Sequence, residues 1–214
     1  LGIQGGLSIL GTQGVVRPMS EPALTATIRA ELSVRAAEEH RGICLVPGNY
    51  GRDMARSLGV PEDRVVGMSN FVGETLEAAA DLGFRDLLLV GQVGKFAKLA
   101  AGCRDTHSRR SDARLETLGV CGALHGASPG EVRRILEANT ADEAATDLLA
   151  APWGPGALQE LADRSVQAAG RICGSQVRLG CLIFALPGRE LARTDTVTPL
   201  VRRLREAPAP AGSP

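Results

Sequence analysis

The densest run of polar side chains in the sequence is residues 106–114, which combine one histidine, three arginines and an acid. His107 could move a proton near neutral pH, because an imidazole titrates in that range. The arginines could hold carboxylates through paired hydrogen bonds. If the run is helical, His107, Arg110 and Arg114 share one face and Arg109 points to solvent. Asp112 then reaches the same site only if the run is partly irregular. The alternative is a solvated helix face without a function.

A glycine-rich turn with a lysine follows the last of four apolar runs. Its chemistry-bearing residues are Gly91, Gln92, Gly94 and Lys95. Backbone amides at the start of a helix, together with the ammonium of Lys95, suit a carboxylate or a phosphate. The turn is not a Walker loop, which needs four residues between its first glycine and its Gly-Lys pair. The alternative is an ordinary strand-to-helix turn with a solvated lysine.

A second glycine-rich turn lies near the start of the chain, where Gly11 and Gly14 flank Thr12 and Gln13. Together with Gly6, it loosely resembles the dinucleotide-binding fingerprint, although its spacing differs from G-x-G-x-x-G. Glycines allow the backbone to approach a ligand closely. A purely structural turn is the alternative here.

Four continuous apolar runs alternate with helical patterns in the first half of the chain. Continuous apolar strands are typical of a parallel sheet that helices cover on both faces. The runs expected to form adjacent buried strands are residues 7–10, 43–46, 65–68 and 87–90. The helices expected in this part are residues 21–39, 50–58, 71–82 and 95–101. The sequence therefore predicts one Rossmann-like α/β domain over residues 1–206, with a mostly parallel sheet.

The loops after these strands are the expected place for a ligand, because open parallel sheets bind ligands at the carboxyl ends of their strands. Each predicted strand ends in small or polar residues, which should meet in one cleft. The candidate binding residues at this edge are Gly11, Thr12, Gly14, Asn49, Ser69, Asn70, Gly91, Gln92, Gly94 and Lys95.

The second half is expected to begin with a helical segment and to end with a late strand at residues 177–186. Capping boxes at Ser128 and Thr140 predict the starts of two helices. Two further helices are expected, at residues 115–124 and 157–172. Residues 207–214 are rich in proline and alanine, and we expect them to be disordered.

Composition argues against several classes of protein. The 24 basic residues balance 24 acidic ones and aromatic residues make up only 3%, so neither charge nor base stacking favours nucleic acid. No apolar run approaches the roughly 18 residues that a membrane span needs. The first residues include neither a methionine nor a basic region, so they predict a cut inside a longer protein rather than a signal peptide. We therefore expect a cytoplasmic protein.

The cysteines and the remaining histidines predict structural roles. The five cysteines are odd in number and form no C-x-x-C pair, which argues against a disulfide framework or a zinc site. We expect buried free thiols and no protein-bound metal. We also expect His40 and His125 on the surface, and Trp153 packed against a loop.

Several of these segments together resemble the cobalt-precorrin-5B C(1)-methyltransferase family, the CbiD type, over roughly residues 3–190. The matching blocks are residues 5–20, 47–49, 69–74, 91–95, 98–102, 106–108 and 112–116. The family tends to have histidine where this chain has Gln92, and more often has threonine where it has Gln13. Family members are considerably longer and carry an additional N-terminal α+β domain, which we expect this chain to lack.

The resemblance implies a function in cobalamin biosynthesis. S-adenosylmethionine would donate a methyl group to ring carbon C1 of cobalt-precorrin-5B, giving cobalt-precorrin-6A, and the cobalt would belong to the substrate. This corrinoid carries acetate and propionate side chains, which accounts for cations such as Arg110, Arg114 and Lys95 in a neutral protein. Orientation of the two reactants should dominate catalysis. His107 is the candidate general base, and Asp112 is its orienter or an alternate base.

Two other interpretations remain open. An NAD-dependent oxidoreductase would also have a glycine-rich first turn, but it calls for an acidic residue after the second strand, where Pro47, Gly48 and Asn49 stand. A non-catalytic fragment that binds the donor or the corrinoid weakly is the other possibility, because the N-terminal domain is expected to be missing. Either the donor or the macrocycle could occupy the first glycine-rich turn.

Overall fold

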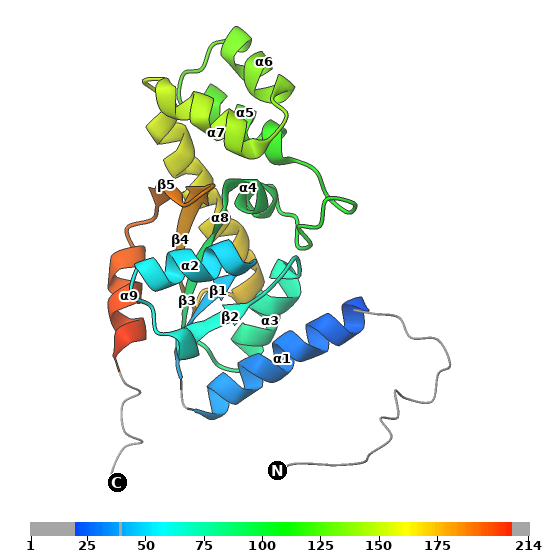
Figure 1. Ribbon diagram of the computed structural model, residues 1–214, viewed down its shortest axis with the longest axis vertical. Coiled ribbons are helices and arrows are strands. Elements are labelled where there is room, and N and C mark those ends of the chain that lie inside the picture. Colours follow the sequence, from blue (N-terminus) through cyan, green and yellow to red (C-terminus); the bar gives the residue numbers. More distant parts are fainter. Residues whose placement is uncertain (1–19, 39, 207–214) are drawn as a thin grey trace.

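The computed structural model describes residues 20–38 and 40–206 (Figure 1). The strand expected at residues 7–10 and the turn containing Gly11, Thr12 and Gly14 lie outside these residues, as does the segment 207–214. The described part is an α/β fold in which helices cover both faces of one sheet.

The sheet has five strands in the order β2-β1-β3-β4-β5. The first four run parallel, and β5 pairs with β4 in the antiparallel sense. The chain passes from β1 outward to β2 and then crosses back to the other side of β1, so the order of strands reverses between β1 and β3. In doubly wound sheets this switch point is where ligands bind. The strands are β1 (Gly42–Val46), β2 (Val65–Gly67), β3 (Asp86–Gln92), β4 (Arg178–Ala185) and β5 (Arg189–Arg193).

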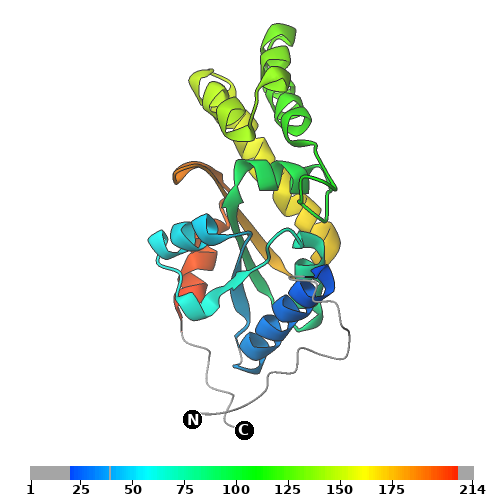
Figure 2. The ribbon, with the colours of Figure 1, turned by 45° about the vertical axis from the view of Figure 1, so that its right-hand side comes forward.

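The parallel strands are mainly apolar because both faces of the sheet are buried there, whereas the edge strand β5 is largely charged and partly exposed. In β1, Ile43 and Leu45 pack into one hydrophobic cluster, and Cys44 and Val46 pack into another on the opposite face. Figure 2 shows α2 and α9 on one side of the sheet, and α1 and α8 on the other. The second face is covered by α2 (Asn49–Ser57) and α9 (Val197–Arg205). The first is covered by α1 (Glu21–Ala37), α3 (Val72–Asp81), α4 (Val93–Ala100) and α8 (Gly154–Cys173).

Helix boundaries follow the local signals in the sequence. The Ser20 hydroxyl caps α1 by accepting a hydrogen bond from the N–H of Ala23, 3.4 Å away. Gly83 follows α3 with a φ of +85°, a conformation that glycine adopts without strain. The full capping box at Ser128 is present, whereas Thr140 caps its helix while Glu143 binds the N–H of Asn139 instead. The predicted helices in the described part are confirmed to within three residues at each end.

Beyond the carboxyl edge of the sheet stands a helical unit that packs on the start of α8 (Figure 1). It consists of α5 (Arg114–Leu124), α6 (Pro129–Glu137) and α7 (Ala141–Ala150). Helix α4 joins this unit to the sheet, because it follows β3 directly and contacts both α5 and α7. The unit therefore covers the strand ends at which a ligand was expected.

Three local expectations were wrong. The run from His107 to Ala113 is not helical, because Asp105 accepts the backbone N–H of His107 and its carbonyl accepts the Ser111 hydroxyl, and such local bonds compete with a helix. His40 is buried, at 8% exposure, between the carboxylates of Glu38 and Asp63. The predicted turn at residues 91–94 is instead the end of β3 and the start of α4.

The remaining structural expectations are mostly confirmed. Residues 43–46, 65–68 and 87–90 mark three adjacent parallel strands, and the late strand is β4. All five cysteines are free, and Cys44, Cys121 and Cys181 are buried while Cys103 and Cys173 are half-buried. His125 is exposed, as predicted.

Candidate functional site

A cavity of about 390 Å³ lies at the carboxyl edge of the sheet, under the helical unit. Its walls come from the end of β2, the junction of β3 and α4, the segment between α4 and α5, and the starts of α5 and α7. These elements meet because β3 carries α4 towards the helical unit. The lining residues are Asn70, Gln92, Gly94, Lys95, Lys98, Thr106, His107, Ser108, Arg114, Thr140, Ala141 and Asp142.

Two lysines one helical turn apart on α4 give the cavity its charge. The Lys95 ammonium donates to the side-chain oxygen of Asn70, and the Lys98 ammonium donates to the carbonyl of Thr106 at 3.0 Å. Burial lowers the pKa of both amines, and neighbouring cations lower it further, Lys98 for Lys95 and Arg114 for Lys98. Within the described residues, neither ammonium forms a salt bridge with a carboxylate. Asp105, Asp112 and Asp142 lie nearby and offset part of this charge, but none of them forms a direct ion pair with either lysine, so the lysines remain open to a further anion.

Three helices point their amino ends at this cavity. Gln92 precedes α4, Ala113 precedes α5 and Thr140 precedes α7. The first N–H groups of a helix have no partner within it and carry a partial positive charge. No side chain caps α4 or α5, whereas the Thr140 hydroxyl caps α7. The helix ends and the lysines thus favour the same class of ligand, an anion.

Arg114 is the third cation of the cavity, and Asp112 holds it in place. The guanidinium donates to both carboxylate oxygens of Asp112, with N–O distances of 2.8 and 3.1 Å. This pairing lowers the pKa of the Asp112 carboxyl. Asp112 itself does not line the cavity. An ionised carboxylate engaged at both oxygens is better suited to positioning Arg114 than to accepting a proton.

His107 lines the cavity through its imidazole ring. The ring Nδ1 accepts a hydrogen bond from the backbone N–H of Arg109 at 3.1 Å, and the backbone N–H of His107 donates to the carboxylate of Asp105 at 2.8 Å. With Nδ1 as an acceptor, the neutral ring carries its proton on Nε2. The neutral ring is therefore arranged to donate a hydrogen bond from Nε2, and using Nε2 as a base would require the other tautomer, whose Nδ1–H could not accept the bond from Arg109.

Comparison with known proteins identifies the family. Residues 105–195 match the profile of the CbiD C-terminal domain. The cobalt-precorrin-5B C(1)-methyltransferase of Desulfitobacterium hafniense is 41% identical over 196 residues, which are 91% of this chain and 50% of that protein. The chain belongs to the CbiD family. The corresponding protein of Alkaliphilus metalliredigens is 36% identical over 206 residues, 96% of this chain and 54% of that protein.

The match to CbiD relatives is partial in length. The relative from Thermoanaerobacter is 45% identical over 144 residues, 67% of this chain and 39% of that protein. The chain thus spans about half the length of the curated relatives it matches. No solved structure matches the chain significantly, so a Rossmann-like relationship stays a prediction from the strand order.

The structure of this CbiD member brings six of the 14 predicted site residues together. The members of the predicted set that line the cavity are Asn70, Gln92, Gly94, Lys95, His107 and Arg114. Arg110 does not join them, because it is exposed and pairs with Glu21 and Asp105. The shared helical face that we expected for it was wrong, since the segment is irregular.

Three predicted residues lie at the same edge without lining the cavity. Asn49 begins α2 with an exposed side chain, and Ser69 adopts a φ of +51° just before Asn70. Gly91 is buried in β3, where an added Cβ would lie 3.0 Å from Phe96 and from Pro47. Gly91 therefore serves packing. Gly11, Thr12 and Gly14 lie outside the described residues.

Half of the residues that line the cavity were not among those predicted from the sequence. Lys98 follows Lys95 by three residues and so shares its helix face, a signal that the spacing did contain. The capping box predicted that a helix starts near Thr140, but no local pattern showed that this start folds back onto α4. The residues missed in this way are Lys98, Thr106, Ser108, Thr140, Ala141 and Asp142.

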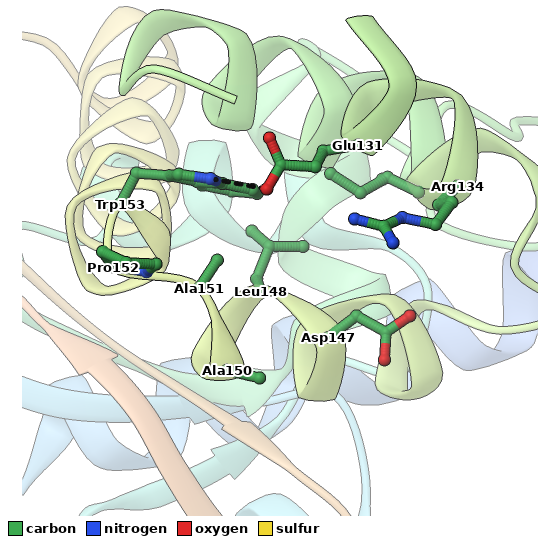
Figure 3. A pocket seen from close by; sticks show the side chains of 9 residues that line it. Glu131, Arg134, Asp147, Leu148, Ala150, Ala151, Pro152 and Trp153 are labelled. Atoms are coloured by element: carbon green, nitrogen blue, oxygen red, sulfur yellow. Dashed lines mark hydrogen bonds between the residues drawn. The ribbon is translucent and has the colours of Figure 1, made fainter. Parts of the chain in front are cut away.

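A second cavity, of about 370 Å³, lies within the helical unit (Figure 3). Figure 3 shows the Trp153 indole above Leu148, with its Nε1 directed at Glu131. That bond is 3.2 Å long, and Glu131 also completes the capping box of α6. Arg134 and Asp147 lie at the side of this cavity. Trp153 joins the start of α8 to α6, which confirms the packing role that we predicted for it.

Across residues 20–38 and 40–206, no group of three or more His, Cys, Asp or Glu side chains is placed to hold a metal ion. In the same part of the chain, no helix has the length and hydropathy needed to cross a bilayer.

Proposed function

We propose that this chain contributes to the methylation of cobalt-precorrin-5B at ring carbon C1, giving cobalt-precorrin-6A in cobalamin biosynthesis. The relatives that match over most of the chain carry the name of this activity. The observation in the structure that supports it is the cationic cavity at the sheet edge, because the substrate is a polycarboxylate. We propose that Arg114, Lys95 and His107 contact the corrinoid and that Asp112 positions Arg114.

S-adenosylmethionine supplies an electrophilic methyl group when bound. The chain offers it a place beside the cavity, at the switch point between β1 and β3. There α2 begins after Gly48, whose backbone has open space around it, and no side chain caps the helix. We propose that Asn49 and Ser69 hold the donor at this edge. The protein's part in the reaction is to align the methyl group with the attacking ring carbon and to exclude water.

The proposal also covers partners and location. The cobalt is part of the substrate, and we propose no resident metal. Because the relatives are about twice as long as the matched stretch, we propose that their remaining portion completes the active site. Five free cysteines fit a reducing compartment, so we propose that the protein acts in the cytoplasm.

Methyl transfer can be tested directly. The protein, alone and with the remaining portion of a CbiD relative, is incubated with isotope-labelled S-adenosylmethionine and cobalt-precorrin-5B. The corrinoid should gain one labelled methyl group, located at C1 by NMR. A parallel calorimetric titration should show binding of S-adenosylhomocysteine and none of NAD. Binding of NAD without binding of S-adenosylhomocysteine would favour an oxidoreductase, and donor binding without transfer in either sample would favour a non-catalytic fragment.

A further inference from the structure

The two lysines of the cavity are the only lysines in the 214-residue sequence. The other 22 of its 24 basic residues are arginines. Both lysines lie on α4 and line the cavity. A chain that otherwise uses arginine throughout thus places both of its primary side-chain amines at one site.

The buried position of the charged Lys98 side chain is expected to destabilise the fold. Its side chain belongs to a residue that is only 3% exposed, and its one hydrogen-bond partner is the neutral carbonyl of Thr106. An ammonium has three N–H donors, so two remain for another partner. Burying a charge without a counter-charge destabilises a fold. Asp105 and Asp112 act on Lys98 only from a distance, and a ligand anion in the cavity would supply the directly paired counter-charge that the described residues do not.

We propose that Lys95 and Lys98 bind a peripheral carboxylate of the macrocycle, and that the methyl donor binds outside this cavity. This inference rests on the proposed function and adds to it an assignment of the two substrates. The carboxylate would sit between the two ammonium groups. The uncapped amino end of α4 faces the same space and adds to the attraction.

Charge decides between the two substrates. The donor combines a sulfonium and an ammonium with a single carboxylate, so its net charge is positive. Its reacting sulfur would lie among Lys95, Lys98 and Arg114, which would repel it. The macrocycle carries several carboxylates around its rim, and its cobalt lies at the centre of the ring. A volume of about 390 Å³ also lies at the low end of ligand pockets, so it suits the side chains of a large ring.

The scarcity of lysine gives the proposal a direct test. Formaldehyde with cyanoborohydride dimethylates primary amines, so the targets in this chain are Lys95, Lys98 and the terminal α-amine. Peptide mass spectrometry follows each target separately, and the α-amine serves as an internal reference. The probes are uroporphyrin, a tetrapyrrole with acetate and propionate chains, and S-adenosylhomocysteine.

We expect saturating uroporphyrin to slow dimethylation of both lysines at least tenfold while the α-amine reacts at its usual rate. S-adenosylhomocysteine should leave both lysine rates unchanged. Protection by S-adenosylhomocysteine alone would overturn the proposal and place the donor in the cavity. Unchanged lysine rates with both probes would also overturn it, because no carboxylate would then bind there.

A variant pair gives a second readout. Lys98→Met keeps the volume of the side chain but removes its charge, and it should weaken uroporphyrin binding at least tenfold. The matched control is Arg109→Gln, which removes an exposed cation beside the cavity and should bind like the parent chain. Thermal unfolding of each variant establishes that it folds. If Lys98→Met does not fold, Lys95→Met replaces it, with the same expected loss.

Equal affinity of the parent chain and a folded lysine variant would overturn the proposal. The outcome is separate from that of the methyl-transfer experiment. Lysine protection without methyl transfer would leave the carboxylate subsite standing and contradict the proposed reaction. Methyl transfer without lysine protection would contradict the subsite alone.

Discussion

The Nδ1 atom of His107 accepts a hydrogen bond from the backbone N–H of Arg109, 3.1 Å away. This bond fixes the ring and leaves the protonated Nε2 for the ligand. We expect His107→Ala to lower turnover by about 10²–10³-fold, the usual effect of losing a hydrogen-bond donor aimed at developing charge, while affinity for the methyl donor stays unchanged. His107→Gln retains a donor group and should recover part of the loss. Steady-state kinetics and donor titration measure both effects, and unchanged turnover in His107→Ala would remove the residue from the site.

Arg114 should govern affinity for the corrinoid. Loss of a charge-assisted hydrogen bond costs about 1.5–3 kcal/mol, so Arg114→Ala should raise the Michaelis constant for the corrinoid roughly 10- to 150-fold. Affinity for the methyl donor should stay nearly the same, because we propose that the donor binds outside the cavity. Arg109→Ala, which removes an exposed neighbouring arginine but keeps its backbone N–H, is the control and should behave like the parent enzyme. Equal Michaelis constants in the two variants would show that Arg114 has no substrate contact.

As the pH rises, uroporphyrin binding should weaken at a lower pH than it would if the two lysines were fully exposed. Because burial lowers the pKa of Lys95 and Lys98, these amines lose their protons, and their attraction for a carboxylate, at a lower pH than an exposed lysine near 10.4. Lys98→Arg, whose guanidinium stays charged, should shift the decline to higher pH. Binding isotherms between about pH 7 and pH 10 test this, and overlapping profiles for parent and variant would contradict it. The titratable or charged groups around Lys98 are Lys95, Cys103, Asp105, His107, Asp112, Arg114 and Asp142.

Gly91 should prove to be a packing residue. An alanine there would bring its Cβ within 3.0 Å of Phe96 and Pro47, and overpacking of a core costs about 1–3 kcal/mol. The melting temperature of Gly91→Ala should fall by roughly 2–4 °C per kcal/mol. Gly130→Ala, at a helical position with open space, should keep or slightly raise it. Normal stability with weakened donor binding in Gly91→Ala would instead restore Gly91 to the site.

Glu131 should make the helical unit sensitive to acid. Hydrogen bonds from Ser128 and Trp153 lower the pKa of its carboxyl, so its contribution to folding is present above the ordinary glutamate pKa and is lost as the pH falls through the lowered one. Glu131→Gln should therefore melt below the parent at pH 7 and approach it near pH 3. Glu137→Gln, at the other end of α6, should change little. A constant difference in melting temperature across this range would rule out the ionised carboxylate as the cause.

The parallel strands could be predicted because burial on both faces of the sheet restricts them to apolar residues. Residues such as Cys44 and Leu88 face one layer of helices while their neighbours face the other, so every position must be apolar. The helix starts at Ser20 and Ser128 could be predicted for a similar reason, since a single side chain meets the need of a free N–H. These features depend on neighbours in sequence.

The site depends on neighbours in space, and there prediction was incomplete. A helix was expected through His107 because its spacing allowed one, but Asp105 satisfies the local backbone in another way. The carbonyl of Thr106 accepts a hydrogen bond from Lys98, and its backbone N–H donates one to the carbonyl of Asn70. These two bonds join three separate elements of the fold. No spacing in the sequence indicates that Thr140, at the start of α7, lines the same cavity as the lysines of α4. Lys98 alone could have been found, as the partner of Lys95 on one helix face.

Strand β3 ends at Gln92 and α4 begins at Val93, with no residue between them. The helix that carries both lysines therefore continues directly from the most central strand. Its backbone cannot move towards a ligand as the backbone of a hinged loop would. A bound carboxylate must therefore reach the lysines, so the length of the side chain that joins it to the macrocycle decides whether it fits. An acetate and a propionate differ in that length by one methylene group. If the proposed carboxylate subsite holds, the cavity would distinguish rim positions of the ring by the length of their side chains, and so would set which ring carbon faces the methyl group.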